Sequence, residues 1–505
     1  MIDFLAVSSY KPCTSKFWVK APLELWRPER MMAMRCKVVW LGFLSFLLLF
    51  NVSSSSTSGA ESTTSQKSGM YHGAGSCAAS ACHGSVQSPG KTRVLQTEFS
   101  TWVGLDKHAN AYTVLTNDVS VRMGKILQTK CADGKPCPPS ESPKCLACHS
   151  LYVPADLHAQ PFGLEDGVSC ESCHGPSSGW LETHIHEGSH HDSVTNRGMN
   201  DLRDLRERAT ICLTCHVGTF ENGKPVKYVD HEMIAAGHPD LMFELTYFSY
   251  RMPQHWKLHA DEGEGPWFNV KAWGVGQAVQ LRDSLYRLAA RAGNPDYAWP
   301  EYAELDCYAC HHSLTQAADS WRLKTTEYYS GRRPGNPPYN ESRVIVFKEL
   351  VEELHPDTAK QLNKELWDVA NQMNKLNGNR KEIADTATRA AQVADQLAKE
   401  LRDQSYDAAL TMRLMRRIAA NYPAIANAGY GAAAQAAMTL DDLSQAYAQN
   451  GGQGMNSGLS ASIDSLNKLF KEQNPSAYSA PQFSERMQSV SKALGVQPAS
   501  ASGSN

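Results

Sequence analysis

Hydrophobic residues recur at helical spacing in the carboxy-terminal part of the chain. Two successive stretches alternate apolar positions by four and three, first Leu362, Leu366, Val369, Met373 and Leu376, then Ile383, Ala387, Ala390, Ala394, Leu397 and Leu401. Stripes of this kind face a helical core. Because only Asn377-Gly378-Asn379 separates the two stretches, we predict an antiparallel pair of helices. Further helices are predicted at Tyr406–Ala420, Gly431–Gln449, Ile463–Gln473 and Phe483–Leu494.

These elements predict a helical bundle domain over residues 334–496. We expect its apolar stripes to form core rather than a face for docking partners. The small, polar tail at residues 497–505 is expected to be disordered.

The stretch before the bundle, residues 70–333, shows poor periodicity. It is rich in Gly, Pro, His and Trp, and we predict one helix in it between Trp267 and Glu304, with Gly293 as a fitting end. The break Gly331-Arg-Arg-Pro-Gly-Asn-Pro-Pro338 marks the boundary with the bundle. We therefore predict a mainly α protein with an irregular amino-terminal domain and a bundle.

Residues 1–69 read as a leader, a signal and a linker. From Met34 the chain is basic, then apolar over residues 38–52, then small and polar, with a cleavage site at Ser58-Gly59-Ala60. The apolar run is shorter than the ~20 residues of a spanning helix. A cleaved secretory signal is favoured, and an uncleaved membrane anchor is the alternative. Either one places the mature chain in the periplasm or otherwise outside the cytoplasmic membrane.

Net charge and cysteine content narrow the classes of function. The chain has 505 residues and a formal net charge of −3, which gives no indication of nucleic-acid binding. Among its 14 cysteines, eight lie in four copies of Cys-x-x-Cys-His, at Cys145–His149, Cys170–His174, Cys212–His216 and Cys307–His311. A relaxed copy, with four residues between its cysteines, runs from Cys77 to His83.

The Cys-x-x-Cys-His motif attaches a c-type haem. Its two thiols form thioether bonds, and its histidine ligates the iron from one face. Structural zinc is the alternative, but a zinc site needs four ligands and each motif offers three. We predict five haems attached at Cys77, Cys82, Cys145, Cys148, Cys170, Cys173, Cys212, Cys215, Cys307 and Cys310, with proximal ligands His83, His149, His174, His216 and His311. The porphyrins would supply the core that the peptide lacks, with little regular structure around stacked haems.

Two further cysteines, Cys131 and Cys137, are followed by no ligating histidine, because Pro138 comes directly after the second. We predict a disulfide between them, as is common in an oxidising compartment.

The order of motifs resembles the cytochrome c-554 family of multihaem cytochromes, relatives of the electron acceptors of hydroxylamine oxidation. The resemblance rests on Cys77–His83, Trp102, His108-Ala-Asn-Ala111, Cys145–His149, Gly167-Val-Ser-Cys-Glu-Ser-Cys-His-Gly-Pro176, His184 and Cys212–His216. It covers about Cys77–His216. The chain departs from the family in its relaxed first motif, its fifth motif and its long carboxy-terminal region.

The resemblance implies that His108 and His184 are distal iron ligands. From their positions in the chain, His238, His72 and His255 are further candidates, and His231 is a weaker one. Four other histidines are expected to be bystanders, namely His186, His190 and His191 in a solvated loop and His312 beside the fifth motif.

The family's second haem lacks a protein ligand on one side, which implies an open haem at His149. The alternative is that another histidine, such as His158, caps it. Aromatic residues near the fifth motif, namely Tyr302, Tyr308 and Trp321, are expected to pack against its haem rather than relay electrons.

Two functions follow. The first is an exported pentahaem cytochrome that carries electrons between redox partner proteins through closely packed haems with histidine on both faces. The alternative is an oxidoreductase that acts on a small nitrogen or sulfur compound at an open haem. The chain lacks the Cys-x-x-Cys-Lys site of pentahaem nitrite reductases, which favours the carrier.

Overall fold

Helices dominate the part of the chain that the structure describes. The computed structural model describes residues 69–90, 92–221, 224–258, 264–307, 310–311, 336–375, 377–452, 457–472 and 475–496. The expected mainly α fold is confirmed. Several predictions lie outside the described residues, namely the signal or anchor at 38–52, the roles of Tyr308, His312 and Trp321, the start of the break at Gly331, and the tail 497–505.

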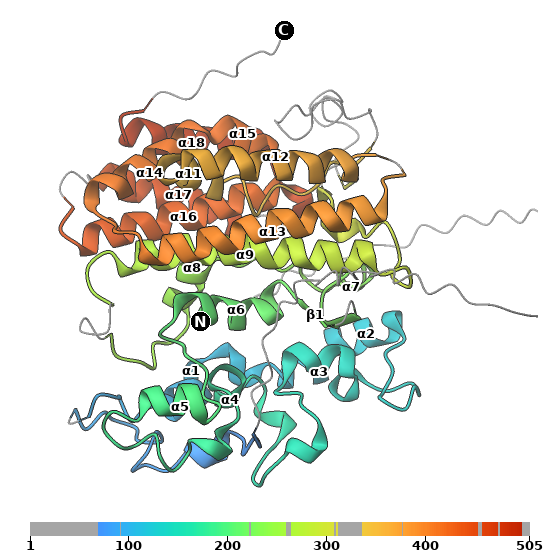
Figure 1. The fold of residues 1–505 in the computed structure, drawn as a ribbon, viewed down its shortest axis with the longest axis vertical. Helices are drawn as coiled ribbons and strands as arrows, with labels where there is room; N and C mark the ends of the chain where they lie inside the picture. Colours follow the sequence, from blue (N-terminus) through green and yellow to red (C-terminus); the bar gives the residue numbers. More distant parts are fainter. Residues whose placement is uncertain are drawn as a thin grey trace, which may run out of the picture. The chain divides into compact units, whose positions relative to one another are not determined.

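The carboxy-terminal helices form a bundle (Figure 1). Its members are α11 (Phe347–Leu354), α12 (Pro356–Met373), α13 (Arg380–Asp403), α14 (Ala408–Ala420), α15 (Tyr422–Asn427), α16 (Tyr430–Gln449), α17 (Ser457–Glu472) and α18 (Ala480–Ala493). The predicted helices are all present. Helices α12 and α13 pack against each other across a short connection, as their stripes predict. Helix α17 starts six residues before the predicted Ile463, because Leu459 is also buried.

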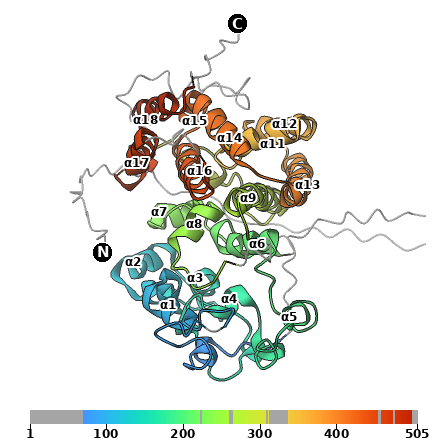
Figure 2. The ribbon, with the colours of Figure 1, turned by 90° about the vertical axis from the view of Figure 1, so that its left-hand side faces the viewer.

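The long helix α9 (Phe268–Gly293) belongs to the same core. It ends at the predicted glycine and lies alongside α13 in both views (Figures 1 and 2). Trp273 of α9 is fully buried and donates its indole N–H to Thr439 Oγ1 at 3.1 Å. The hydrophobic core runs from Leu205 to Leu494 and so includes residues on both sides of position 333. The described residues all belong to one compact unit, and the predicted domain division stays a prediction.

The amino-terminal region consists of short helices and loops, as predicted. It contains η1 (Ala74–Cys77), α1 (Glu98–Leu105), η2 (Lys107–Asn110), η3 (Thr113–Thr116), α2 (Asp118–Leu127), η4 (Pro139–Glu141), α3 (Pro143–His149), η5 (Ala155–Leu157), η6 (Leu164–Asp166), α4 (Cys170–His174), η7 (Ser177–Gly179), α5 (His190–Asn196) and α6 (Leu205–His216). A two-stranded antiparallel sheet of β1 (Thr219–Glu221) and β2 (Lys224–Lys227) follows, then α7 (His231–Ala236), α8 (Leu245–Arg251) and, after α9, η9 (Tyr302–Glu304).

One local expectation was wrong. His190 and His191 do not lie in a loop but begin helix α5. Side chains later in this helix bond back to its first turn, since Thr195 Oγ1 donates to the His191 carbonyl oxygen at 2.6 Å. His186 precedes the helix and is exposed, as expected.

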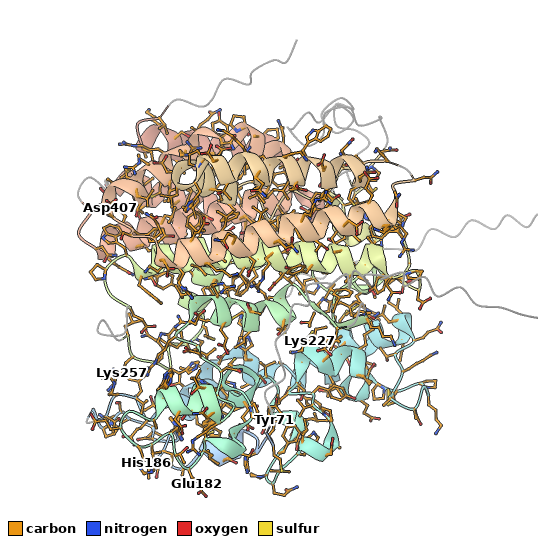
Figure 3. All side chains as sticks on the ribbon, viewed as in Figure 1. Tyr71, Glu182, His186, Lys227, Lys257 and Asp407 are labelled. Atoms are coloured by element: carbon orange, nitrogen blue, oxygen red, sulfur yellow. A yellow bond between two sulfur atoms is a disulfide. The ribbon has the colours of Figure 1, made fainter. Side chains whose placement is uncertain are left out.

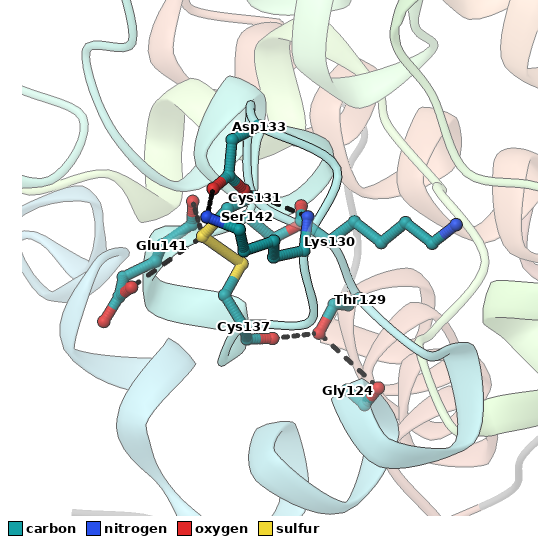
Figure 4. The surroundings of a disulfide bond; sticks show 9 residues. Gly124, Thr129, Lys130, Cys131, Asp133, Cys137, Glu141 and Ser142 are labelled. Carbon is teal, nitrogen blue, oxygen red and sulfur yellow. Dashed lines mark hydrogen bonds and ion pairs between the residues drawn. A yellow bond between two sulfur atoms is a disulfide. The ribbon is translucent and has the colours of Figure 1, made fainter.

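A disulfide joins Cys131 and Cys137, which confirms that prediction (Figure 4). Hydrogen bonds hold the ends of its loop: Thr129 Oγ1 donates to the Cys137 carbonyl oxygen at 2.7 Å, and Ser142 Oγ donates to the Lys130 carbonyl oxygen at 3.0 Å. The loop therefore anchors the segment that leads into α3.

Among the described helices, none combines the length and the apolar composition needed to cross a bilayer.

Candidate functional site

The Cys-x-x-Cys-His motifs occupy the ends of short helices. Helices α3, α4 and α6 each end on the histidine of a motif. Since three residues make almost one helical turn, the two thiols of each motif lie on one face. The relaxed motif begins at the end of η1, and the fifth follows η9. All ten motif cysteines are free of disulfides.

Four histidines of the motifs each face a second histidine. The ring centres are 6.1 Å apart for His83 and His184, 6.4 Å for His108 and His216, 6.3 Å for His149 and His238, and 6.2 Å for His231 and His311. The partners in each pair are far apart in sequence. The fold thus brings together one motif histidine and one histidine from elsewhere, four times.

These separations fit a haem iron with histidine on both faces. A ligating imidazole nitrogen lies about 2 Å from its metal, and the ring centre is about 1 Å behind that nitrogen, so two opposed rings on one metal have centres about 6 Å apart. The four pairs meet this requirement although their ring planes are related by angles of 16° to 90°. Haem c is the group that the neighbouring thiols can hold.

Hydrogen bonds at Nδ1 orient the rings of these pairs. His83 Nδ1 bonds to Glu98 Oε2 at 2.9 Å, and His108 Nδ1 bonds to Asp106 Oδ1 at 3.0 Å. Both carboxylates, through these hydrogen bonds, raise the pKa of the imidazole they hold. An acceptor on one ring nitrogen fixes the tautomer and makes the other nitrogen a better metal ligand.

Backbone carbonyl groups do the same for three more rings. The oxygen of Ala111 accepts from His149 Nδ1 at 2.9 Å, that of Leu181 from His184 Nδ1 at 2.7 Å, and that of Pro239 from His238 Nδ1 at 2.8 Å. In each case Nε2 is the nitrogen left for a metal.

The one motif histidine outside these four pairs, His174 of the third motif, lies in a different setting. Burial, followed by the charges of His255 and other histidines, lowers its pKa to about 4. Among the described residues no ring pair includes His174, and His255 is the histidine with the largest electrostatic influence on it. His72 lies beside the same motif, where its Nδ1 shares a hydrogen bond with Ser177 Oγ at 2.9 Å.

Thiols from different motifs are neighbours. A hydrogen bond with Cys77 is the main cause that raises the pKa of Cys170, and one with Cys215 is the main cause that raises the pKa of Cys148. Lys227 of β2, labelled in Figure 3, donates from its Nζ to Cys215 Sγ over 3.5 Å. The motifs are numbered in chain order, from Cys77–His83 as the first to Cys307–His311 as the fifth. The first motif therefore adjoins the third, and the second adjoins the fourth.

The third and fourth motifs adjoin as well. Burial raises the pKa of Cys173 to about 12, and the charges of Cys212 and Cys215 add to this effect. The four motifs are thus connected in the spatial order first, third, fourth, second.

The structure places the predicted distal ligands as follows. His108, His184 and His238 each face a motif histidine, whereas His72 and His255 lie near the third motif and, among the described residues, pair with no histidine ring. His231, the weaker candidate, faces His311. Its signal in the sequence is its spacing of seven residues from His238, which places both at one short helix.

The expected open face at His149 has no support in this geometry, because the His238 ring lies opposite. His158 does not cap the site either, since its Nε2 donates to the Val153 carbonyl oxygen at 3.0 Å and its ring stacks on Phe162. Within the described residues, no cluster of three or more His, Cys, Asp or Glu side chains is arranged to hold a metal ion by itself.

In comparison with known families, residues 62–175 match the family described as cytochrome c554 and c-prime. The matched stretch contains the first three motifs and ends directly after the third. No curated protein and no solved structure matches the chain.

Proposed function

We propose that this chain is a c-type cytochrome that carries electrons through five covalently attached haems, since its residues 62–175 match the family described as cytochrome c554 and c-prime. The match itself supports haem c and a role in electron transfer. The number of haems rests on the four strict motifs and the relaxed one.

The opposed histidine rings carry the proposal. Ring centres 6.1–6.4 Å apart leave room for one iron between each pair. An iron with histidine on both faces has no free position for a small molecule, so it is low-spin and exchanges electrons without binding substrate. This property favours a carrier over the enzymatic alternative at His149.

We assign the second ligand of the His174 haem to His255. Its charge is the largest influence on the pKa of His174 after burial. Its Nδ1 donates to the Pro253 carbonyl oxygen at 3.2 Å, which leaves Nε2 for the metal as in the other rings. His72 stays the alternative ligand.

The proposed setting is outside the cytoplasmic membrane, and the proposed partners are proteins that donate and accept single electrons. Three features support an exported chain: the leader pattern, the haem-attachment motifs and the disulfide.

Two measurements on the purified protein test this function. Intact mass gives the number of haems and the start of the mature chain, and we expect five haems. The electron paramagnetic resonance spectrum of the oxidised protein should then show low-spin haem alone, and the reduced protein should bind no carbon monoxide. A mass without haem would refute the cofactor, and a high-spin fraction of about one haem in five would support the enzymatic alternative.

A matched pair of variants tests the axial ligands. His184→Ala should convert about one haem in five to the high-spin state, because the ring opposite His83 is lost. His186→Ala removes an exposed histidine two residues away and should leave the spectrum unchanged. Equal spectra for both variants would refute the pairing of His83 with His184.

A further inference from the structure

Helix α7 places two histidines opposite two different motifs. His231 is its first residue, and His238 follows its end. The six residues of α7 rise about 9 Å along its axis, so the two histidines lie at opposite ends of the helix. The His238 ring faces His149 at 6.3 Å, and the His231 ring faces His311 at 6.2 Å.

We propose that His231 is the second axial ligand of the haem attached at Cys307 and Cys310, and that α7 thereby connects this fifth haem to the haem attached at Cys145 and Cys148. The inference rests on the proposed function and extends it to a part of the chain beyond the matched residues 62–175.

The first turn of α7 is tied to the second motif. Asp230 caps the helix by accepting the backbone N–H of Met233 at 2.8 Å. The same carboxylate pairs with Lys144 at 3.2 Å, and Lys144 directly precedes Cys145. The position of His231 is therefore fixed relative to the second haem site as well as to its own.

A second group of contacts ties His231 to the fifth motif. Glu301 accepts the backbone N–H groups of His231 and Ala303 at 3.0 and 2.9 Å. The Tyr302 ring meets the His231 ring edge-on, with 5.5 Å between their centres. Glu301 and Tyr302 lie on the segment that leads to Cys307, so the two ligands of the fifth iron are held on adjoining backbone.

Two arginines of α9 hold the segment before His231 and the segment before Cys307 against the bundle. Glu304, three residues before Cys307, is 3% exposed and lies between Arg287 and Arg291, at 2.8 and 2.6 Å. Arg291 also donates to the carbonyl oxygen of Val229 at 2.9 Å, two residues before His231. One buried cluster thus sets the distance between the segments that carry His231 and His311.

The fifth haem would then extend the row of neighbouring haems beyond the second haem. Through His238, α7 faces the second motif, and through His231 it faces the fifth, so the fifth haem would lie beside the second. Cys307 and Cys310 are exposed, as is Cys82 of the first motif. The first and fifth motifs are therefore the two that include exposed cysteines.

The test compares His231→Ala with His186→Ala in the full-length haem protein. Intact mass should show five haems in both variants. His231→Ala should turn about one haem in five high-spin, and added imidazole should restore the low-spin spectrum. His238→Ala should do the same at another haem, and the double variant should turn about two haems in five high-spin.

The outcomes separate the inference from the proposed function. A wild-type mass with fewer than five haems would refute the proposed count. Five haems that all stay low-spin in His231→Ala would overturn the assignment of His231 while the carrier function stands.

A second variant tests the connection through α7. Cys307→Ala combined with Cys310→Ala should yield four haems by mass. Its redox titration should show a shifted potential for the haem at His149 and an unchanged one for the haem at His83. Four unchanged potentials would refute the connection.

Discussion

Replacing Glu304 by Gln tests the buried cluster that supports the fifth motif. The carboxylate accepts hydrogen bonds from Arg287 Nε and Nη2 and from Arg291 Nη1, all between 2.6 and 2.8 Å. The side chain of Arg291 is fully buried and that of Arg287 is 11% exposed. The variant keeps the shape of the side chain and removes its charge, so two buried guanidinium groups lose their counter-ion.

The expected loss can be worked out in two ways. Removing one partner of a buried ion pair costs about 3–5 kcal/mol, because the remaining charge is left uncompensated. Independently, burial opposes the ionisation of Glu304, but the charges of Arg287 and Arg291 outweigh it and lower its pKa from 4.5 to about 2. That difference corresponds to about 3 kcal/mol of folding free energy. We therefore expect Glu304→Gln to lose roughly 3 kcal/mol at neutral pH.

The same shift predicts a pH dependence. A carboxyl group whose pKa is lower in the folded state than in the unfolded state stabilises the fold when the pH is above both values. The contribution of Glu304 is complete above its ordinary pKa of 4.5 and is lost as the pH falls towards 2. The variant has no such group, so the difference in stability between wild type and variant should shrink over this range.

The assay is urea unfolding followed by far-ultraviolet circular dichroism at a series of pH values. Asp385→Asn is the matched control, since Asp385 pairs with Lys381 on the exposed face of α13, and it should cause no measurable loss. If Glu304→Gln unfolds at the same urea concentration as Asp385→Asn at neutral pH, the cluster does not stabilise the fold as argued.

Three further outcomes are expected. Leu285→Ala, in the fully buried part of α9, should lower the free energy of unfolding by about 2–5 kcal/mol, measured by urea unfolding. Cys131→Ser combined with Cys137→Ser should lower the free energy of unfolding by about 2 kcal/mol, because the disulfide closes a loop with a sequence separation of 6. An unchanged urea midpoint would contradict this. Glu98→Gln should raise the reduction potential of one haem, since the acceptor that makes His83 a stronger ligand loses its charge, and spectroelectrochemistry would detect the shift.

The sequence predicted the long helices well because their core stripes are regular. Helix α9 ends at Gly293, and α12 and α13 cover the two predicted stripes. Helices α11 and α15 were not predicted, since elements of eight and six residues are too short to show a repeat. The core shared by α6 and α9 also escaped prediction, because it depends on contacts between segments that are distant in sequence.

The proximal residues of the candidate site follow from the motifs, but the pairing of histidines does not. His83 and His184 meet only because the loops between them bring α4 and the first motif together. His231 looks like a polar residue at the start of a short helix, and the sequence does not reveal that it faces His311. Glu304 and its two arginines would be assigned to the surface from composition, yet they are buried because their charges compensate one another.

The packing of α6 has a consequence for the order of biogenesis. Cys212 lies on α6 and packs against the hydrophobic core that α9 and the later helices complete. A thioether forms only while its sulfur is accessible to the porphyrin, so the haem proposed for the fourth motif would have to be attached before that core closes. Synthesis from the amino terminus provides this interval, because the chain emerges with Cys212 well ahead of the segments that will cover it.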